Sequence, residues 1–214
     1  MRNRFDNQLF ELNRELIEMG AMCEEAIGSV VQALTTGDIA LAEKVKANSS
    51  GIDQMERAIE SRCMKLLLHQ QPVAKDLRQI SAALKMITDM ERIGDQAEDI
   101  AEIVTFLKGH TMEGMELIEE MARETIEMVT ASVDAFVKKD VELAKQVIIQ
   151  DDVVDAYFSG VKRGIISIIA ENPMDGEFAL DLLMISKYFE RIGDHATNIA
   201  EWVIYSVTGT HKEV

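Results

Sequence analysis

The stretch ERIGDQAEDIAE at residues 91–102 returns near the end of the chain as ERIGDHATNIAE at residues 190–201. Each copy begins with a glutamate that is followed four residues later by an aspartate, a spacing that places both carboxylates on one face of a helix. A glycine lies between the two acids, and a glycine inside a helix costs about 1 kcal/mol. Because this costly pattern occurs twice, we predict that the chain contains two copies of one structural unit.

The duplication extends outward from these two stretches. Residues 37–42 (GDIALA) match residues 139–144 (KDVELA), and the aspartate in each segment can cap the helix that follows it. The only prolines, Pro72 and Pro173, fall at matching points. Each proline is placed where a second helix is expected to end and a third to begin, because proline suits the first position of a helix.

Apolar residues between these breaks recur with the spacing of amphipathic helices, as in Leu9, Leu12 and Leu16. No stretch shows the alternation of a strand with hairpin turns, so the predicted fold class is all-α. We expect two tandem, pseudo-symmetric three-helix bundles, formed by residues 1–109 and residues 110–214. The expected helices span residues 5–35, 39–69, 74–107, 112–137, 141–171 and 176–207.

Composition narrows the classes of function. The chain has 214 residues and a formal net charge of −16, which disfavours nucleic-acid binding because phosphate neutralisation needs clustered Lys and Arg. Cys23 and Cys63 fit neither a C-x-x-C pattern nor a zinc spacing, and we interpret them as reduced core residues. The N-terminal residues lack the apolar stretch of a signal peptide. We therefore expect a cytoplasmic protein.

The acidic faces of the two predicted third helices are the strongest candidates for a functional site. Glu91 and Asp95 form the first pair, and Glu190 and Asp194 form the second. Like charges at this spacing repel each other by a few tenths of a kcal/mol, about 0.2–0.5 per pair. A bound cation would offset that repulsion, and the glycine between the acids would allow close approach of another helix or a ligand.

The predicted second helices supply further carboxylates. Asp151 and Asp155 are again four residues apart, but the matching positions in the first unit are Ser49 and Asp53, so one acid is missing there. An antiparallel pairing of helices brings these residues toward the acids of the third helix in the same unit. We therefore expect two carboxylate clusters, with the one in the first unit less complete.

Oxygen ligands of this kind suit hard cations such as Mg²⁺, Mn²⁺ or iron. The alternative is that these faces are solvated and paired with basic side chains, as acidic helix faces commonly are. Arg92 and Arg191 lie beside the acids and are expected to form salt bridges with them. His195 is next to Asp194 but not on its face, so we expect it at the surface or at a cap.

Several of these features together resemble the PhoU family. They are the duplicated ERIGD helices, the segment DHATNIAE at residues 194–201, the turn at residues 71–78 and the D-x-x-x-D pattern at residues 151–155. The resemblance covers nearly the whole chain. It implies two similar three-helix bundles in a cytoplasmic protein that is often a homodimer and is not an enzyme.

The resemblance also implies a function. PhoU proteins are negative regulators of phosphate uptake and of the phosphate-starvation response, working with the ATPase of the phosphate ABC transporter and with a membrane sensor histidine kinase. Any association with the membrane would then be peripheral, through these partners. Some members bind metal clusters, which here implies iron, zinc, manganese or magnesium, with Asp99 and Asn198 as further possible ligands. Carried over by position, the ligand set is Asp53, Glu91, Asp95, Asp151, Asp155, Glu190 and Asp194.

Two other functions remain open on the residues alone. The chain could be an acidic helical scaffold that docks basic partners without metal, because charge complementarity alone can mediate docking. It could also be a carboxylate-bridged metal enzyme, but such sites use Glu-x-x-His pairs. No glutamate stands three residues before any of the four histidines, so the sequence disfavours an enzyme of this kind.

Overall fold

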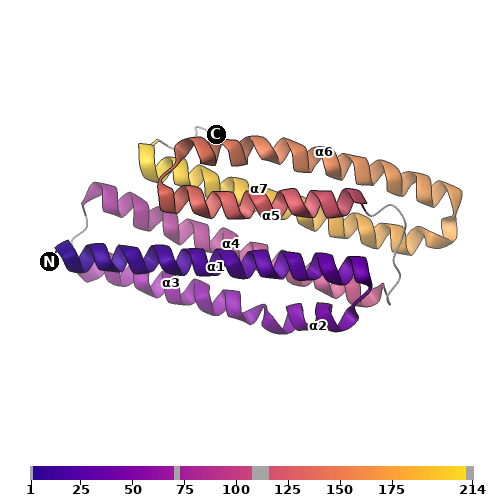
Figure 1. The fold of residues 1–214 in the computed structure, drawn as a ribbon, viewed down its shortest axis with the longest axis horizontal. Helices are drawn as coiled ribbons and strands as arrows, with labels where there is room; N and C mark the ends of the chain where they lie inside the picture. The colour runs from indigo at the N-terminus through magenta and orange to yellow at the C-terminus, as the bar shows by residue number, and fades with distance from the viewer. Residues whose placement is uncertain (1, 70–72, 108–115, 211–214) are drawn as a thin grey trace.

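The computed structural model describes residues 2–69, 73–107 and 116–210, which form α-helices and one 3₁₀ turn without any strand. The predicted all-α class, with two pseudo-symmetric three-helix bundles, is confirmed (Figure 1). In the first bundle, α2 and α3 together form one of the three helices, which is interrupted between them. The elements of the first bundle are α1 (Arg2–Thr36), α2 (Ile39–Asn48), α3 (Ser50–His69) and α4 (Ala74–Phe106). Those of the second are α5 (Glu116–Lys138), α6 (Val141–Glu171), η1 (Pro173–Asp175) and α7 (Gly176–Thr208).

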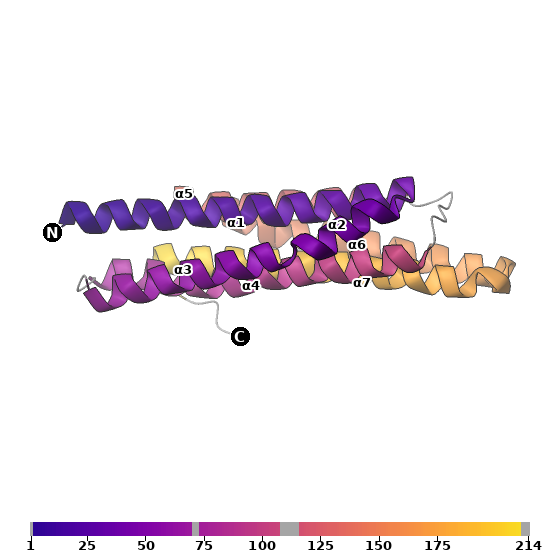
Figure 2. The same ribbon diagram turned by 90° about the horizontal axis from the view of Figure 1, so that it is seen from below.

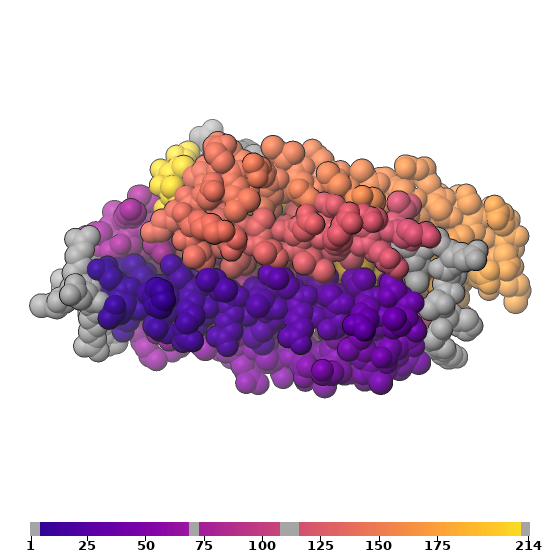
Figure 3. All heavy atoms as spheres, in the orientation of Figure 1, coloured from indigo at the N-terminus to yellow at the C-terminus, as the bar shows by residue number. Residues whose placement is uncertain are grey.

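The two bundles lie side by side along their lengths (Figures 1 and 2). The third helices, α4 and α7, share the most extensive contact between any two elements, and α1 packs against α5. The α3–α4 end and the α6–α7 end lie at opposite ends of the molecule in Figure 1. Figure 3 shows the face on which α1 and α5 form one continuous surface. The acidic third helices are therefore central to the assembly of the two halves.

The apolar stripes predicted from the sequence form a shared core. Leu12, Leu16 and Cys23 are fully buried on α1, and each large aliphatic side chain so buried contributes about 1.5–3 kcal/mol relative to exposure. Both cysteines are buried and free, as predicted. Burial raises the pKa of Cys23 and of Cys63 to about 12, so neither thiol ionises near neutral pH.

One predicted helix, residues 39–69, is wrong as a single element because it is interrupted at Ser49. The Ser49 hydroxyl donates a hydrogen bond to the carbonyl of Lys46 at 3.0 Å, and the amide of Ile52 donates to the Ser49 carbonyl at 3.0 Å. The second bond spans three residues and tightens the turn locally. Figure 2 shows α2 leaving the line of α3 at this point. The matching helix of the second bundle, α6, is continuous.

The connections follow the expected chemistry with one difference. The Asp38 carboxylate accepts a hydrogen bond from the amide of Leu41 at 3.0 Å and caps α2, as predicted. Pro173 does not open α7. It begins the 3₁₀ turn η1, and α7 starts at Gly176. Three predicted features lie outside the described residues. They are Pro72, the boundary between the two units at residues 109 and 110, and the helix start at residue 112.

None of the helices in the described ranges combines the length and the apolar character that crossing a membrane requires.

The glycines of the two ERIGD stretches lie where the second helix of each unit crosses the third. A Cβ atom added to Gly94 would lie 2.8 Å from Cδ1 of Ile52 on α3. A Cβ atom added to Gly193 would lie 3.2 Å from Oδ1 of Asp151 and 3.5 Å from Val154 on α6. The predicted close approach of a helix to these glycines is confirmed. It brings the acids of α3 and α6 beside those of α4 and α7.

We expect the substitution Gly94→Ala to lower the free energy of unfolding by about 1 kcal/mol. Its new methyl group meets Ile52, and such overpacking costs about 1–3 kcal/mol, which outweighs the gain of about 1 kcal/mol in helix propensity. Adding Ile52→Val should recover part of the lost stability, because it removes the clashing Cδ1 atom but leaves Cγ2 at 3.2 Å. The measurement is urea unfolding followed by circular dichroism.

Gly28→Ala is the matched control, because a Cβ atom there would meet nothing within 4 Å. It should stabilise the protein by up to about 1 kcal/mol. Equal stabilisation by Gly94→Ala would contradict the tight crossing.

Candidate functional site

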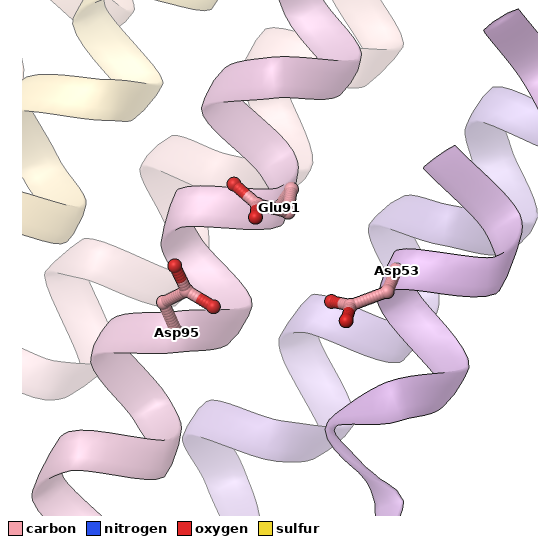
Figure 4. A group of neighbouring side chains, drawn as sticks. All are labelled: Asp53, Glu91 and Asp95. Carbon is pink, nitrogen blue, oxygen red and sulfur yellow. The ribbon is translucent and has the colours of Figure 1, made fainter. Parts of the chain in front are cut away.

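Three carboxylates predicted from the sequence meet in the first unit (Figure 4). Asp53 comes from α3, and Glu91 and Asp95 come from successive turns of α4. One carboxylate oxygen from each lies within 4.8 Å of the others, and all three residues are half-buried. Figure 4 shows Asp53 pointing across the gap between the helices toward the two acids of α4. This first-unit cluster forms even though Ser49 replaces one acid.

The first-unit cluster carries unfavourable electrostatics. Burial raises the pKa of Glu91, and the neighbouring charge of Asp95 raises it further. Burial also raises the pKa of Asp95, while Arg92 opposes that shift. Burial and the repulsion of ionised neighbours both disfavour the charged form of a carboxyl group. The cluster would therefore gain stability from a cation that these oxygen atoms can share.

The protein itself supplies part of that positive charge. Arg92 lies 3.5 Å from Glu91 and 3.3 Å from Asp95, so the predicted salt bridge is confirmed. The Arg92 side chain is 56% exposed, and exposed ion pairs of this kind contribute only about 0–1 kcal/mol. The arginine reduces the repulsion between the two acids without removing it.

Glu56 is a neighbour of the first-unit cluster that was not among the predicted site residues. Its charge helps to raise the pKa of Glu91, and its own pKa is raised by burial and then by Glu60 and Asp53. Glu56 follows Asp53 by three residues, which places both on one face of α3. This three-residue spacing could have identified Glu56 from the sequence.

The four predicted acids of the second unit are less compact. Among the described residues, no three of them bring their oxygen atoms as close together as the first-unit cluster does. Asp155 and Asp194 are exposed, and Glu190 forms an ion pair with Lys187. Lys187 therefore neutralises one member of the set. We call Asp151, Asp155, Glu190 and Asp194 the second-unit acids.

Asp151 is the most perturbed of the second-unit acids. Its carboxylate lies over Gly193. Burial, followed by the charges of Asp194 and Asp155, raises its pKa to about 6. The equivalent residue in the first unit, Ser49, is instead bonded to its own helix. Near the matching glycines, the second unit therefore has a carboxylate where the first unit has a hydroxyl group.

Asp99, Asn198 and His195 belong to the contact between α4 and α7. His195 is half-buried, with Nδ1 2.9 Å from Oδ1 of Asp89. The amide nitrogen of Asn198 donates to the same oxygen at 3.2 Å. The expected surface position of His195 is therefore wrong, since it bridges the two bundles. Asp89 could not be predicted from the duplication, because the matching position in the second unit is Tyr188 rather than an acid.

Comparison with known proteins gives consistent matches over nearly the whole chain. The PhoU domain matches residues 16–104 and again residues 118–203. The chain is 36% identical to the "Phosphate-specific transport system accessory protein PhoU homolog" of Clostridium acetobutylicum, over 100% of this chain and 98% of that protein.

Two crystal structures share the fold. That of PhoU from Pseudomonas aeruginosa has a TM-score of 0.91 and 35% identity, over 96% of this chain and 100% of that one. That of the phosphate transport system regulatory protein PhoU from Streptococcus pneumoniae has a TM-score of 0.89 and 26% identity, over 98% of this chain and 100% of that one.

We expect Asp151→Asn to stabilise metal-free protein at neutral pH. The pKa of Asp151 is raised from 3.8 to about 6, so the native state holds this proton more tightly than the unfolded state and stability falls as pH rises through that window. The substitution removes this cost, which is about 1 kcal/mol once solvent screening is allowed for. Thermal unfolding in a chelating buffer, repeated across pH, measures the effect.

The gain should vanish below pH 3.8, where the carboxyl group is protonated in both states. Glu18→Gln, at an exposed position of α1, is the control and should change little, because Glu18 is not among the charges that raise the pKa of Asp151. A gain for Asp151→Asn that does not vary with pH would contradict the electrostatic origin.

Proposed function

Because this chain belongs to the PhoU family, we propose that it is an accessory protein of phosphate-specific transport that restrains phosphate uptake and the phosphate-starvation response. The observation that carries this proposal is the similarity over the full length of both chains to a protein bearing that name. The similarity includes both units, so it supports a role for the complete chain rather than for one bundle.

The proposal extends to how the chain acts. It couples the ATPase of the phosphate ABC transporter to a sensor histidine kinase at the cytoplasmic face of the membrane, as a homodimer and without catalysing a reaction. The net charge of −16 supports docking to basic surfaces on those partners. The similar protein from Streptococcus pneumoniae is named a regulatory protein of phosphate transport, which supports a role outside catalysis.

Metal binding is a second part of the proposal. The half-buried first-unit cluster offers only oxygen atoms, which suit magnesium, manganese or iron better than zinc. The raised pKa values of Glu91 and Asp95 fit this use, because a cation would relieve the repulsion that raises them. Asp53, Glu91 and Asp95 would hold the ion, and the second-unit acids would form a second site. The ion would cross-link α3 to α4.

One set of contacts favours a metal-free alternative. Arg92 pairs with Glu91 and Asp95, and Lys187 pairs with Glu190, so internal cations already neutralise part of both acidic groups. In that case the acidic faces would serve as docking surfaces for basic partners. The same regulatory role would then operate by charge complementarity alone.

The regulatory role is tested in the source organism by deleting this chain and following a phosphate-starvation promoter in phosphate-rich medium. Deletion should switch the promoter on, and re-expression of the intact chain should silence it again. Affinity purification of the chain from the same cells should recover the transporter ATPase and the sensor kinase. A promoter that stays silent after deletion, together with neither partner recovered, would refute the proposal.

Metal binding is tested by mass spectrometry of metal content in untagged protein that has not met a chelator. Replacing Asp53, Glu91 and Asp95 with their amides should remove the ion that the first-unit cluster holds, because the oxygen ligands lose their charge. The matched control replaces three exposed glutamates that lie on other surfaces, and it should keep the ion. These glutamates are Glu11, Glu43 and Glu142.

If wild-type protein holds no metal after exposure to iron, manganese, zinc and magnesium, the metal site is excluded. The acidic faces would then act only as docking surfaces. Affinity purification with the three-amide variant shows whether the first-unit cluster is also needed to bind the partner proteins. Loss of the ion with loss of the partners indicates a metal-dependent interaction.

A further inference from the structure

A cavity of about 360 Å³ lies in the first unit between α1, α2 and the start of α3. Its lining includes Ser49 and the two residues after it, so it lies at the break between α2 and α3. Part of the wall is apolar and is formed by the side chains of Met22, Val45 and Ile52. This volume is at the lower end of the range for small-molecule sites.

The second unit shows how the same space is filled elsewhere in this chain. Met128 on α5 reaches across to Gly193, where its Cε lies 3.8 Å from the position of an added Cβ atom. The equivalent residue of the first unit is Ala26, and both Ala26 and Gly94 line the cavity. The side chain that occupies this space in the second unit is therefore missing from the first.

A polar contact differs in the same way. In the second unit Gln150 of α6 donates a hydrogen bond to Glu124 of α5 and ties the two helices together. The equivalent positions in the first unit are Asn48 and Met22, and both of them line the cavity. Three differences between the repeats, at the methionine, at this polar pair and at Ser49, all fall around the same cavity.

Opposite charges stand on two walls of the cavity. Glu25 is on α1 and Lys44 is on α2. Neither side chain forms an ion pair within 4.0 Å or a hydrogen bond with any residue in the described part of the chain. Ser29 and Asn48 add neutral hydrogen-bonding groups to the lining. The cavity thus offers one anionic group, one cationic group and an apolar interior.

We propose that this cavity binds a small zwitterion with an apolar side chain, chemically like an apolar amino acid. The ammonium group of the ligand faces Glu25, its carboxylate faces Lys44, and its side chain fills the space that Met128 fills in the second unit. Charge-assisted hydrogen bonds at both ends fix its orientation. Burial of its side chain against Ala26 and Ile52 supplies apolar contact.

The cavity is connected to the first-unit cluster through Ile52. That residue lines the cavity, packs against Gly94 and directly precedes Asp53 on α3. A ligand in the cavity holds the start of α3 in place and with it the Asp53 carboxylate. The site therefore goes beyond the proposed regulatory function and stands on separate residues.

The test is isothermal titration of the full chain with each of the standard L-amino acids. We expect an apolar amino acid such as leucine to bind the wild type. Ala26→Met copies the second unit and fills the cavity, so it should abolish binding. Ala21→Met makes the same change at an exposed position of α1 outside the cavity and should leave binding intact.

Two half-molecules test the charge pair. 4-Methylpentanoate lacks the ammonium group of leucine, and 3-methylbutylamine lacks its carboxylate, so each should bind about tenfold more weakly or worse. Because Glu25 and Lys44 are exposed, Glu25→Gln and Lys44→Gln preserve packing and should each weaken leucine binding about tenfold. These variants keep the test valid if Ala26→Met fails to fold.

Three results would overturn the proposal. The first is that no amino acid binds folded wild-type protein. The second is that leucine binds folded Ala26→Met, or both charge variants, as tightly as it binds wild type. The third is that both half-molecules bind as tightly as leucine, since the cavity would then recognise only the apolar group.

Discussion

Gly94 and Gly193 let the second helix of each unit cross the third helix at close range, and the candidate site depends on that crossing. A side chain at either glycine would meet the neighbouring helix, at 2.8 Å from Ile52 or at 3.2 Å from Asp151. The crossing places carboxylates of one helix beside carboxylates of the next, in partly buried surroundings where repulsion is poorly screened. The glycines permit tight packing, and this packing brings carboxylates together that repel each other. A cation or a basic partner would reduce that repulsion. Helix packing and the candidate site depend on the same two glycines.

The contact between α4 and α7 makes one molecule out of two bundles. It is mostly apolar, but Asp89 accepts hydrogen bonds across it from His195 and Asn198. The pseudo-symmetric counterpart places Tyr188 of α7 beside Asp99 of α4, and burial and the charge of Asp99 raise the pKa of Tyr188. These polar groups are half-buried, apart from the exposed Asn198, and their pairing across the contact helps to fix the register of the two helices. Because the acidic faces lie on these two helices, their relative position is set by this contact.

The two units have diverged around a shared frame. The first unit gathers three carboxylates and opens a cavity at the break in its second helix. The second unit keeps that helix continuous, fills the matching space with Met128 and neutralises Glu190 with Lys187. Duplication supplies two copies of a stable packing arrangement, so one copy can change its local chemistry while the other preserves the fold. The differences between the copies are consequently informative about function.

The sequence by itself determined the helical class, the duplication and the acidic faces, because helical periodicity and i,i+4 spacing are local properties of the chain. It also located the glycines of the crossing. Only the tertiary structure decided which acids meet, because the packing of α3 against α4 brings Asp53 beside Glu91 and Asp95. The break between α2 and α3 has a signal in the sequence that the prediction of a single helix overlooked, because residues 48–51 (NSSG) are four consecutive poor helix formers. Ser49 itself keeps helical angles (φ −55°, ψ −39°). The partnership of Asp89 with His195 joins residues more than one hundred positions apart, so only packing of the two bundles could reveal it.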